Sequence, residues 1–117
     1  MKHVLLVWLV VILFGCSTQA VKTSAKQSTD ELLEFAKANC FFWYFKNNNY
    51  DLQDIRAISG GIIEMGSYSA DKYQQVSLLV KEYQPLITTK QNIDVDLLKC
   101  FQLERDAEFI RSLNEIK

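Results

Sequence analysis

The sequence predicts a small compact all-α domain of four to five helices, stapled by one disulfide and preceded by a cleaved signal peptide. Apolar residues recur at helical spacing through most of the chain after residue 28. Residue types that begin and end helices stand between these apolar stretches. Two cysteines, Cys40 and Cys100, form an even pair within the same region. The domain is therefore expected to span residues 29–117.

Residues 1–20 are expected to be a signal peptide, because Lys2 precedes an apolar run at 4–14 that is shorter than the roughly 20 residues of a membrane span. Two processing sites remain open. Residues 13–16 resemble a lipobox, in which Cys16 would be lipidated and would anchor the protein to the outer membrane. The small residues at 18–20 offer a cleavage site that would remove Cys16. Both alternatives place the mature protein in the periplasm.

The oxidising periplasm favours a disulfide between Cys40 and Cys100, with free thiols as the alternative. Residues 21–28 are polar and small, which predicts a flexible tether. Ser28 and Glu31 then have the spacing of a capping box at the start of a first helix. Its apolar face is formed by Leu32, Phe35, Ala36, Cys40 and Trp43, and Asn47-Asn48-Asn49 ends it.

A second helix is predicted to begin near Asp51 and to end at Gly66. Gly60 and Gly61 lie inside it, and each costs about 1 kcal/mol relative to alanine in a helix interior. Close approach of another helix backbone is the expected compensation, because the pair lacks the strand and the lysine of a phosphate loop. The expected apolar face consists of Leu52, Ile55, Ile58, Ser59 and Ile62.

A third helix is predicted from Ser69, its expected cap, to Pro85, which stops it. Its apolar stripe is Tyr73, Val76, Val80 and Tyr83. A connector over residues 86–94 leads to a fourth helix capped by Asp94. The apolar phase shifts near residues 104–106, which predicts a kink or break before a C-terminal helix. The stripe of that last helix is expected to be Ala107, Ile110 and Leu113, with Phe109 and Ile116 alongside.

Five consecutive aromatic residues occupy positions 41–45. On a helix they point in all directions, so a single core cannot receive all of them. Two explanations remain open. Either this is a central helix that other helices surround, or part of the cluster forms a homodimer interface, where aromatic residues are enriched.

Composition and residue types exclude several function classes. Thirteen basic and fourteen acidic residues give a net charge near −1, without the basic excess of a nucleic-acid-binding protein. The only histidine, His3, lies in the predicted leader, so the domain lacks a Ser-His or Cys-His nucleophile pair and a histidine metal ligand. Most carboxylates fall on polar faces or caps of the predicted helices. We therefore expect no enzyme activity, no catalytic residue, no metal and no cofactor.

The predicted mature domain resembles the immunity proteins that protect bacteria from the amidase effectors of type VI secretion systems. The resemblance covers about residues 28–116 and rests on short motifs in a fixed order, of which the Leu-x-Lys-Cys segment near the C-terminus is the most specific. The matching segments are Asn39-Cys40 with the aromatic residues that follow, Asp54-Ile55 with Ala57, Glu64-Met65-Gly66, Tyr73, Leu78-Leu79-Val80, Tyr83 and Asp96–Leu103.

The resemblance implies a periplasmic inhibitor rather than an enzyme. Such proteins bind a cognate peptidoglycan amidase, a Cys-His peptidase that cuts the γ-D-glutamyl–diaminopimelate bond, and block its active-site groove. It also implies a homodimer and a protruding loop that enters the groove. Residues 87–93 are the candidate loop, although an ordinary helix connector is the alternative. The partner-binding residues expected on this basis are Glu82, Tyr83, Thr88, Thr89, Lys90, Gln91 and Asn92.

Other functions fit many of the same residues. An envelope lipoprotein that binds another exported protein as a structural or assembly factor would have the same leader, disulfide and helices. An envelope enzyme fits less well, because the mature region has no histidine. A neighbouring gene that encodes a small Cys-His amidase would favour immunity, whereas a neighbouring secretion or assembly component would favour the lipoprotein.

Overall fold

The computed structural model describes residues 24–117, with side chains from Glu31 onward, and it confirms the predicted all-α fold. The predicted signal peptide, the lipobox and Cys16 lie outside the described residues. Within residues 24–117 there is no β-strand, and no described helix is both long and apolar enough to cross a membrane. The elements are α1 (Ser24–Asn47), α2 (Gln53–Met65), α3 (Ala70–Glu82), α4 (Val95–Gln102), a 3₁₀ turn η1 (Leu103–Arg105) and α5 (Ala107–Glu115).

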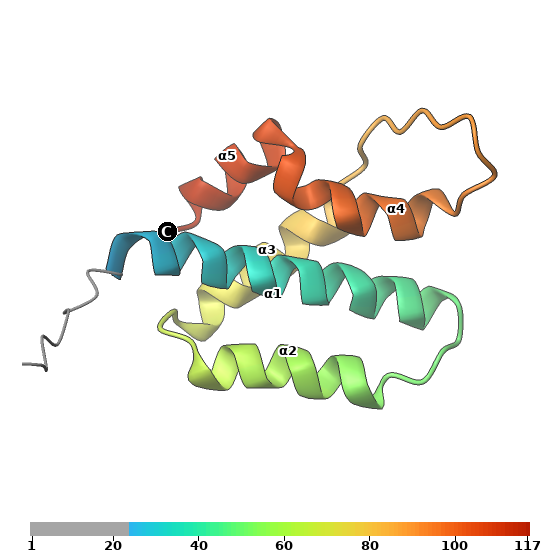
Figure 1. Cartoon of the computed structure of the whole chain (residues 1–117). Helices are drawn as coiled ribbons and strands as arrows, with labels where there is room; N and C mark the ends of the chain where they lie inside the picture. Colours follow the sequence, from blue (N-terminus) through green and yellow to red (C-terminus); the bar gives the residue numbers. More distant parts are fainter. Residues whose placement is uncertain (1–23) are drawn as a thin grey trace, which may run out of the picture.

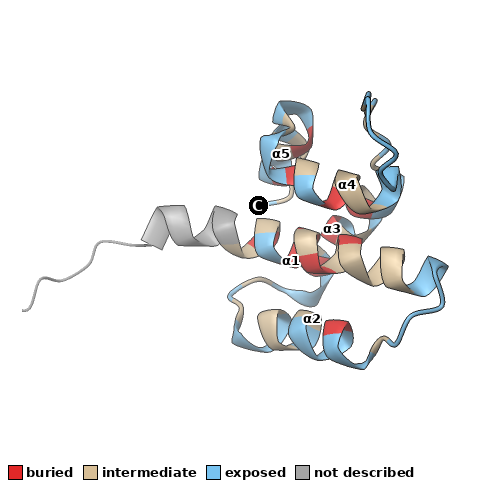
Figure 2. Cartoon of the chain, turned by 45° about the vertical axis from the view of Figure 1, so that its right-hand side comes forward, coloured by how far each residue is buried: buried red, intermediate tan, exposed pale blue. Residues whose placement is uncertain are grey.

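Helix α1 is the centre of the fold (Figure 1). Helix α2 packs along one side of it, α3 along a second side, and α4, η1 and α5 along a third. The buried residues of the surrounding helices face α1, whereas α2 is mostly exposed (Figure 2). The core consists of Leu32, Phe35, Ala36, Cys40, Tyr73, Val76, Val80, Cys100, Leu103, Phe109 and Leu113.

The aromatic cluster at residues 41–45 follows from this central position. All five side chains are half-buried, and they reach different neighbours. The rings of Phe41 and Phe101 meet edge to face at 5.4 Å between centroids, while the Tyr44 hydroxyl donates to Asp94 Oδ2 at 3.2 Å. A central helix surrounded by others therefore accounts for the cluster, and the homodimer interface is left as a proposal.

The predicted disulfide is confirmed. Cys40 on α1 and Cys100 on α4 are bonded, with their Cα atoms 5.5 Å apart. Both cysteines are buried in the core, where neighbouring apolar side chains surround the bond. The link holds α4 against α1 at the level of Val80 on α3, which lies in the same core cluster.

The start of α1 differs from the prediction. The helix begins at Ser24, so residues 24–28, predicted as part of a tether, are helical, and Ser28 lies inside the helix rather than at its cap. Glu31 makes tertiary contacts instead of completing a capping box. Its carboxylate accepts hydrogen bonds from the Ser67 N–H at 2.9 Å and from the Ser67 hydroxyl at 3.0 Å, and also from the Tyr73 hydroxyl. These bonds hold the α2–α3 connection against α1.

The glycines of α2 also differ from the prediction. Outside their own helix backbone and chain neighbours, no atom lies within 4 Å of the place where a Cβ on Gly60 or Gly61 would stand, so no second backbone approaches there. Ile58, predicted to lie on the apolar face, is exposed as well. The close approach occurs instead at Gly66, where a Cβ would collide with the Tyr73 hydroxyl and the Glu31 carboxylate. Gly66 has φ −80°, so the requirement for glycine is steric.

The remaining helices largely follow the sequence. Asp94 caps α4 by accepting from the Asp96 and Leu97 N–H groups, at 2.9 and 3.3 Å. Asp106 caps α5 in the same way. The predicted break is the turn η1. Ser69 precedes α3 as predicted, but its side chain makes no capping bond.

The last helix differs from the prediction at Ala107, while the other predicted apolar residues contact the core. Ala107 is exposed, whereas Phe109 and Leu113 are buried in the core, with Ile110 and Ile116 packed at its edge. The spacing of Phe109 and Leu113, four residues apart, places both on the side that faces α1 and α3.

We expect opposite effects from alanine at the two kinds of glycine. Gly60→Ala or Gly61→Ala should raise the free energy of unfolding by about 0.5–1 kcal/mol, because alanine lowers the entropy cost of the helix and meets open space. Gly66→Ala should lower it by about 1–3 kcal/mol, because the Cβ displaces the Tyr73–Glu31 contact. Urea unfolding measures all three variants, and a stabilised Gly66→Ala protein would contradict this packing.

The disulfide should be a major source of stability. The Cys40→Ala/Cys100→Ala variant should lose about 4 kcal/mol of unfolding free energy, because the bond closes a loop with a sequence separation of 60 residues. Urea unfolding of this variant and of the oxidised protein gives the difference. If the variant lost less than about 1 kcal/mol of unfolding free energy, the bond would not be constraining the unfolded chain.

Candidate partner-binding surface

A loop over residues 83–94 connects α3 to α4 and projects from the body of the protein (Figure 1). Its first end is fixed at Tyr83. The Tyr83 hydroxyl donates to Asp106 Oδ2 at 2.7 Å, and its ring packs against Phe109 with the centroids 5.0 Å apart. The Lys99 ammonium donates to the Tyr83 carbonyl at 3.3 Å. The loop therefore starts from a residue that is tied to both α4 and α5.

The second end of the loop is fixed at Asp94. One carboxylate oxygen caps α4, and the other accepts the hydrogen bond from Tyr44 on α1. Asp94 thus orients the first turn of α4 and holds the end of the loop to the central helix. Anchoring at both ends limits the conformations of the chain between them.

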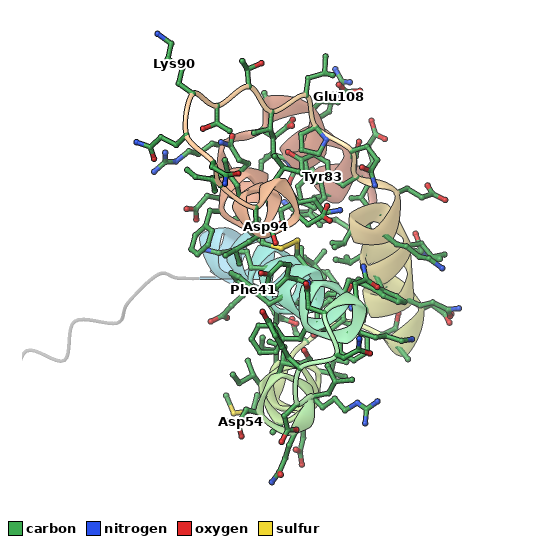
Figure 3. The ribbon with its side chains drawn as sticks, turned by 90° about the vertical axis from the view of Figure 1, so that its right-hand side faces the viewer. Phe41, Asp54, Tyr83, Lys90, Asp94 and Glu108 are labelled. Atoms are coloured by element: carbon green, nitrogen blue, oxygen red, sulfur yellow. A yellow bond between two sulfur atoms is a disulfide. The ribbon has the colours of Figure 1, made fainter. Side chains whose placement is uncertain are left out.

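The tip of the loop, residues 88–92, is organised locally. Thr89 Oγ1 accepts a hydrogen bond from the Gln91 N–H at 3.1 Å, and the Ile93 N–H donates to the Gln91 carbonyl at 2.9 Å. Apart from half-buried Thr89, the tip residues are exposed. Lys90 extends away from the body (Figure 3). The tip consequently offers hydroxyl, amide and ammonium groups to a partner.

The predicted rim residues lie at the base of this loop. Glu82 is exposed and Tyr83 is half-buried, and both line an open groove of about 690 Å³ between the loop base and α5. Figure 3 looks onto this end of the molecule and shows Tyr83 on the same side as Glu108 of α5. The hydroxyl of Tyr83 is already bonded to Asp106, so the residue serves first to position the loop.

Leu86 is a surface residue that the sequence analysis did not single out. It is fully exposed and lines the same groove. An apolar side chain in open water at the base of a projecting loop is well placed for contact with a partner. The sequence feature that could have identified Leu86 is its position directly after Pro85, where the chain has left α3 and turns outward.

Hydrogen bonding and burial change the acidity of the anchoring groups. The pKa of Tyr83 is raised by burial and by its hydrogen bond to Asp106. The pKa of Asp106 is lowered, because its carboxylate accepts this hydrogen bond and two more from backbone N–H groups. Burial and the bond to Glu31 raise the pKa of Tyr73 to about 12. At Glu31, burial acts to raise the pKa, but the bonds from Tyr73 and Ser67 outweigh it and lower the pKa.

Among the described residues, no group of three or more histidine, cysteine or carboxylate side chains is arranged to hold a metal ion. The two cysteines of this region are consumed by the disulfide. What the loop and its groove provide is a set of exposed hydrogen-bonding groups together with apolar side chains, of which Leu86 is the most exposed, on a support fixed to three helices.

The Tyr83–Asp106 bond should make stability depend on pH. Folding lowers the pKa of Asp106. The stabilisation from its hydrogen bonds is therefore complete when the pH is above the ordinary carboxyl pKa near 4, and it is lost as the pH falls through the lowered pKa. Tyr83→Phe should therefore cost about 1–2 kcal/mol at pH 7, and less once the pH falls below the lowered pKa of Asp106. Urea unfolding across this range tests the prediction. Tyr44→Phe, which removes an exposed bond, should cost less, and an equal cost would contradict the anchoring role of Tyr83.

Comparison with known proteins found no match, either to a protein family model, to a curated protein or to a solved structure.

Proposed function

We propose that this chain is a periplasmic immunity protein that binds a cognate peptidoglycan amidase effector of a type VI secretion system and blocks its active-site groove. The observation that carries the proposal is the projecting loop with both ends anchored and a polar, exposed tip. The family resemblance supplies the class of partner.

The physical basis of inhibition is a loop that is ordered before it binds. A flexible segment loses conformational freedom when it enters a groove, and this loss weakens binding. Here Tyr83 and Asp94 hold the ends, and the bond from the Gln91 N–H to Thr89 shapes the tip, so less freedom remains to be lost. A loop that fills an active-site groove excludes the peptidoglycan strand without any chemistry of its own.

The tip has groups suited to a catalytic cleft. Cleft walls of a Cys-His peptidase present backbone N–H and carbonyl groups together with the catalytic side chains. The threonine hydroxyls and the Gln91 and Asn92 amides can both donate and accept hydrogen bonds, and Lys90 adds a positive charge. In this proposal Leu86 and Glu82 contact the rim of the cleft, and the protein acts as a homodimer that presents two such loops.

The first test is calorimetry of the purified oxidised protein with the product of its neighbouring gene. We expect a complex of nanomolar affinity, corresponding to about −12 kcal/mol, and loss of peptidoglycan hydrolysis by the partner. If the neighbouring product is not a hydrolase, or does not bind, the immunity proposal fails, and membrane fractionation of acylated Cys16 would then test the envelope lipoprotein.

The loop prediction is tested by replacing residues 88–92 with alternating glycine and serine. Binding should weaken at least about a hundredfold, which is close to 3 kcal/mol, while the thermal midpoint changes little because the tip contributes nothing to the core. Gln74→Ala/Gln75→Ala, on an exposed part of α3, is the matched control and should bind like the original protein. Unchanged affinity in the loop variant would show that the loop does not enter the groove.

A further inference from the structure

Trp43, with two lysine ammonium groups over its ring, lies beside the base of the loop. The ammonium groups of Lys46 on α1 and Lys81 on α3 lie over the ring of Trp43, at 5.0 and 5.3 Å from its centroid. The indole N–H donates to Asn39 Oδ1 at 3.1 Å, which fixes the orientation of the ring. Cation–π attraction keeps both ammonium groups near the indole although their chains are long.

This arrangement borders an open pocket of about 350 Å³. Trp43, Lys81 and Lys99 line it, from α1, α3 and α4, and the disulfide cysteine Cys40 lies at its wall. The pocket adjoins the first end of the loop, because Lys81 stands two residues before Tyr83, Gln84 of the loop lines the pocket, and the Lys99 ammonium bonds to the Tyr83 carbonyl.

The charges of the pocket are unbalanced. Among the described residues, the ion pairs within 4.0 Å join Lys37 to Glu104 and Arg111 to Glu108, so none involves Lys46, Lys81 or Lys99. Asp96 is the carboxylate that lines the pocket, against the ammonium groups of Lys81 and Lys99, with Lys46 nearby. The pocket is therefore positively charged in a chain whose total charge is −1.

Helix geometry explains part of this pattern. Lys46, Lys81 and Lys99 each lie in the last turn of a helix, where a positive charge is favoured by the helix dipole. The dipole accounts for a lysine at each helix end, but it does not require Lys46 and Lys81 to meet over one indole, nor Lys81 and Lys99 to line one pocket with a single carboxylate. A negatively charged ligand would satisfy this charge.

We infer that the pocket receives a carboxylate side chain from an acidic segment of the protein partner. A carboxylate can accept from the ammonium groups of Lys81 and Lys99, while the amides of Asn47 and Gln84, which also line the pocket, can donate further hydrogen bonds. The face of Trp43 provides apolar contact for the methylene groups of an aspartate or glutamate. The inference rests on the proposed function only for the identity of the partner.

The pocket gives the partner a second contact beside the loop. Opposite charges across an interface accelerate association and select among partners, because a partner with a basic surface at this place would be repelled. An effector that engages the loop would therefore carry an aspartate or glutamate at the rim of its groove, positioned to reach Trp43.

The experiment uses the fluorescence of Trp43 in a Trp8→Phe background, where it is the single tryptophan of the chain. The probe is a nine-residue peptide of alternating glutamate and glycine, and its glutamine counterpart is the control peptide. We expect a saturable fluorescence change with the acidic peptide, binding at least about tenfold tighter than the control. In Lys46→Gln/Lys81→Gln, which removes the two ammonium groups over Trp43 and keeps the bond from Lys99 to the Tyr83 carbonyl, the affinity should fall about tenfold. Lys37→Gln, a lysine paired elsewhere, should bind as before.

Three results would overturn the inference: equal binding of the two peptides, equal affinity in the double variant, or equally tight binding of free glutarate, which would assign the pocket to a small anion. Calorimetry with the neighbouring gene product separates the two proposals. If that protein binds the original and the double variant equally, the pocket inference fails and the immunity function stands. If it binds neither, but the acidic peptide still binds in a lysine-dependent way, the pocket stands and the proposed partner is wrong.

Discussion

Helix α1 is apolar around most of its circumference, and the other helices are arranged by the need to keep water away from it. Leu32, Phe35 and Ala36 are buried, and the aromatic cluster at 41–45 is half-buried on all sides. Burial of apolar surface is the main favourable term in folding, so each surrounding element is held by what it covers on α1. The disulfide adds a covalent link between the central helix and one of its covers.

The same constraint brings the proposed recognition features together. Helices α3 and α4 both pack on α1, and the loop between them is tied to α4 and α5 at Tyr83 and to α1 at Asp94. Trp43 of α1 lies beside the first end of this loop, where it lines a pocket with Gln84. Fold stability and the proposed partner recognition thus share residues: Tyr83 and Asp94 hold helices together and also fix the ends of the loop.

Much of the fold could be predicted because its signals are local or periodic: the caps Asp94 and Asp106, the stripe of α3 and the paired cysteines. The misassigned features depend on tertiary neighbours. Glu31 has the sequence spacing of a capping-box residue, but its carboxylate bonds to Ser67 and Tyr73. Glycines inside a helix do not show from sequence whether another helix packs against them. For the candidate site, Pro85 and the polar run after it indicated a loop. The lysines around Trp43 could not be seen, because they come together from separate helices.

The loop lies inside the segment that the disulfide closes, since residues 83–94 fall between Cys40 and Cys100. Exposed loop tips are preferred sites for proteolytic cleavage, and this protein is expected to work in a compartment that contains proteases. A cut at the tip would leave two fragments joined through sulfur, with α4 still seated on α1 and every core residue retained. The covalent ring therefore confines the damage from a single cleavage to the proposed recognition loop, and the cleaved protein would remain folded while losing the binding that we propose for it.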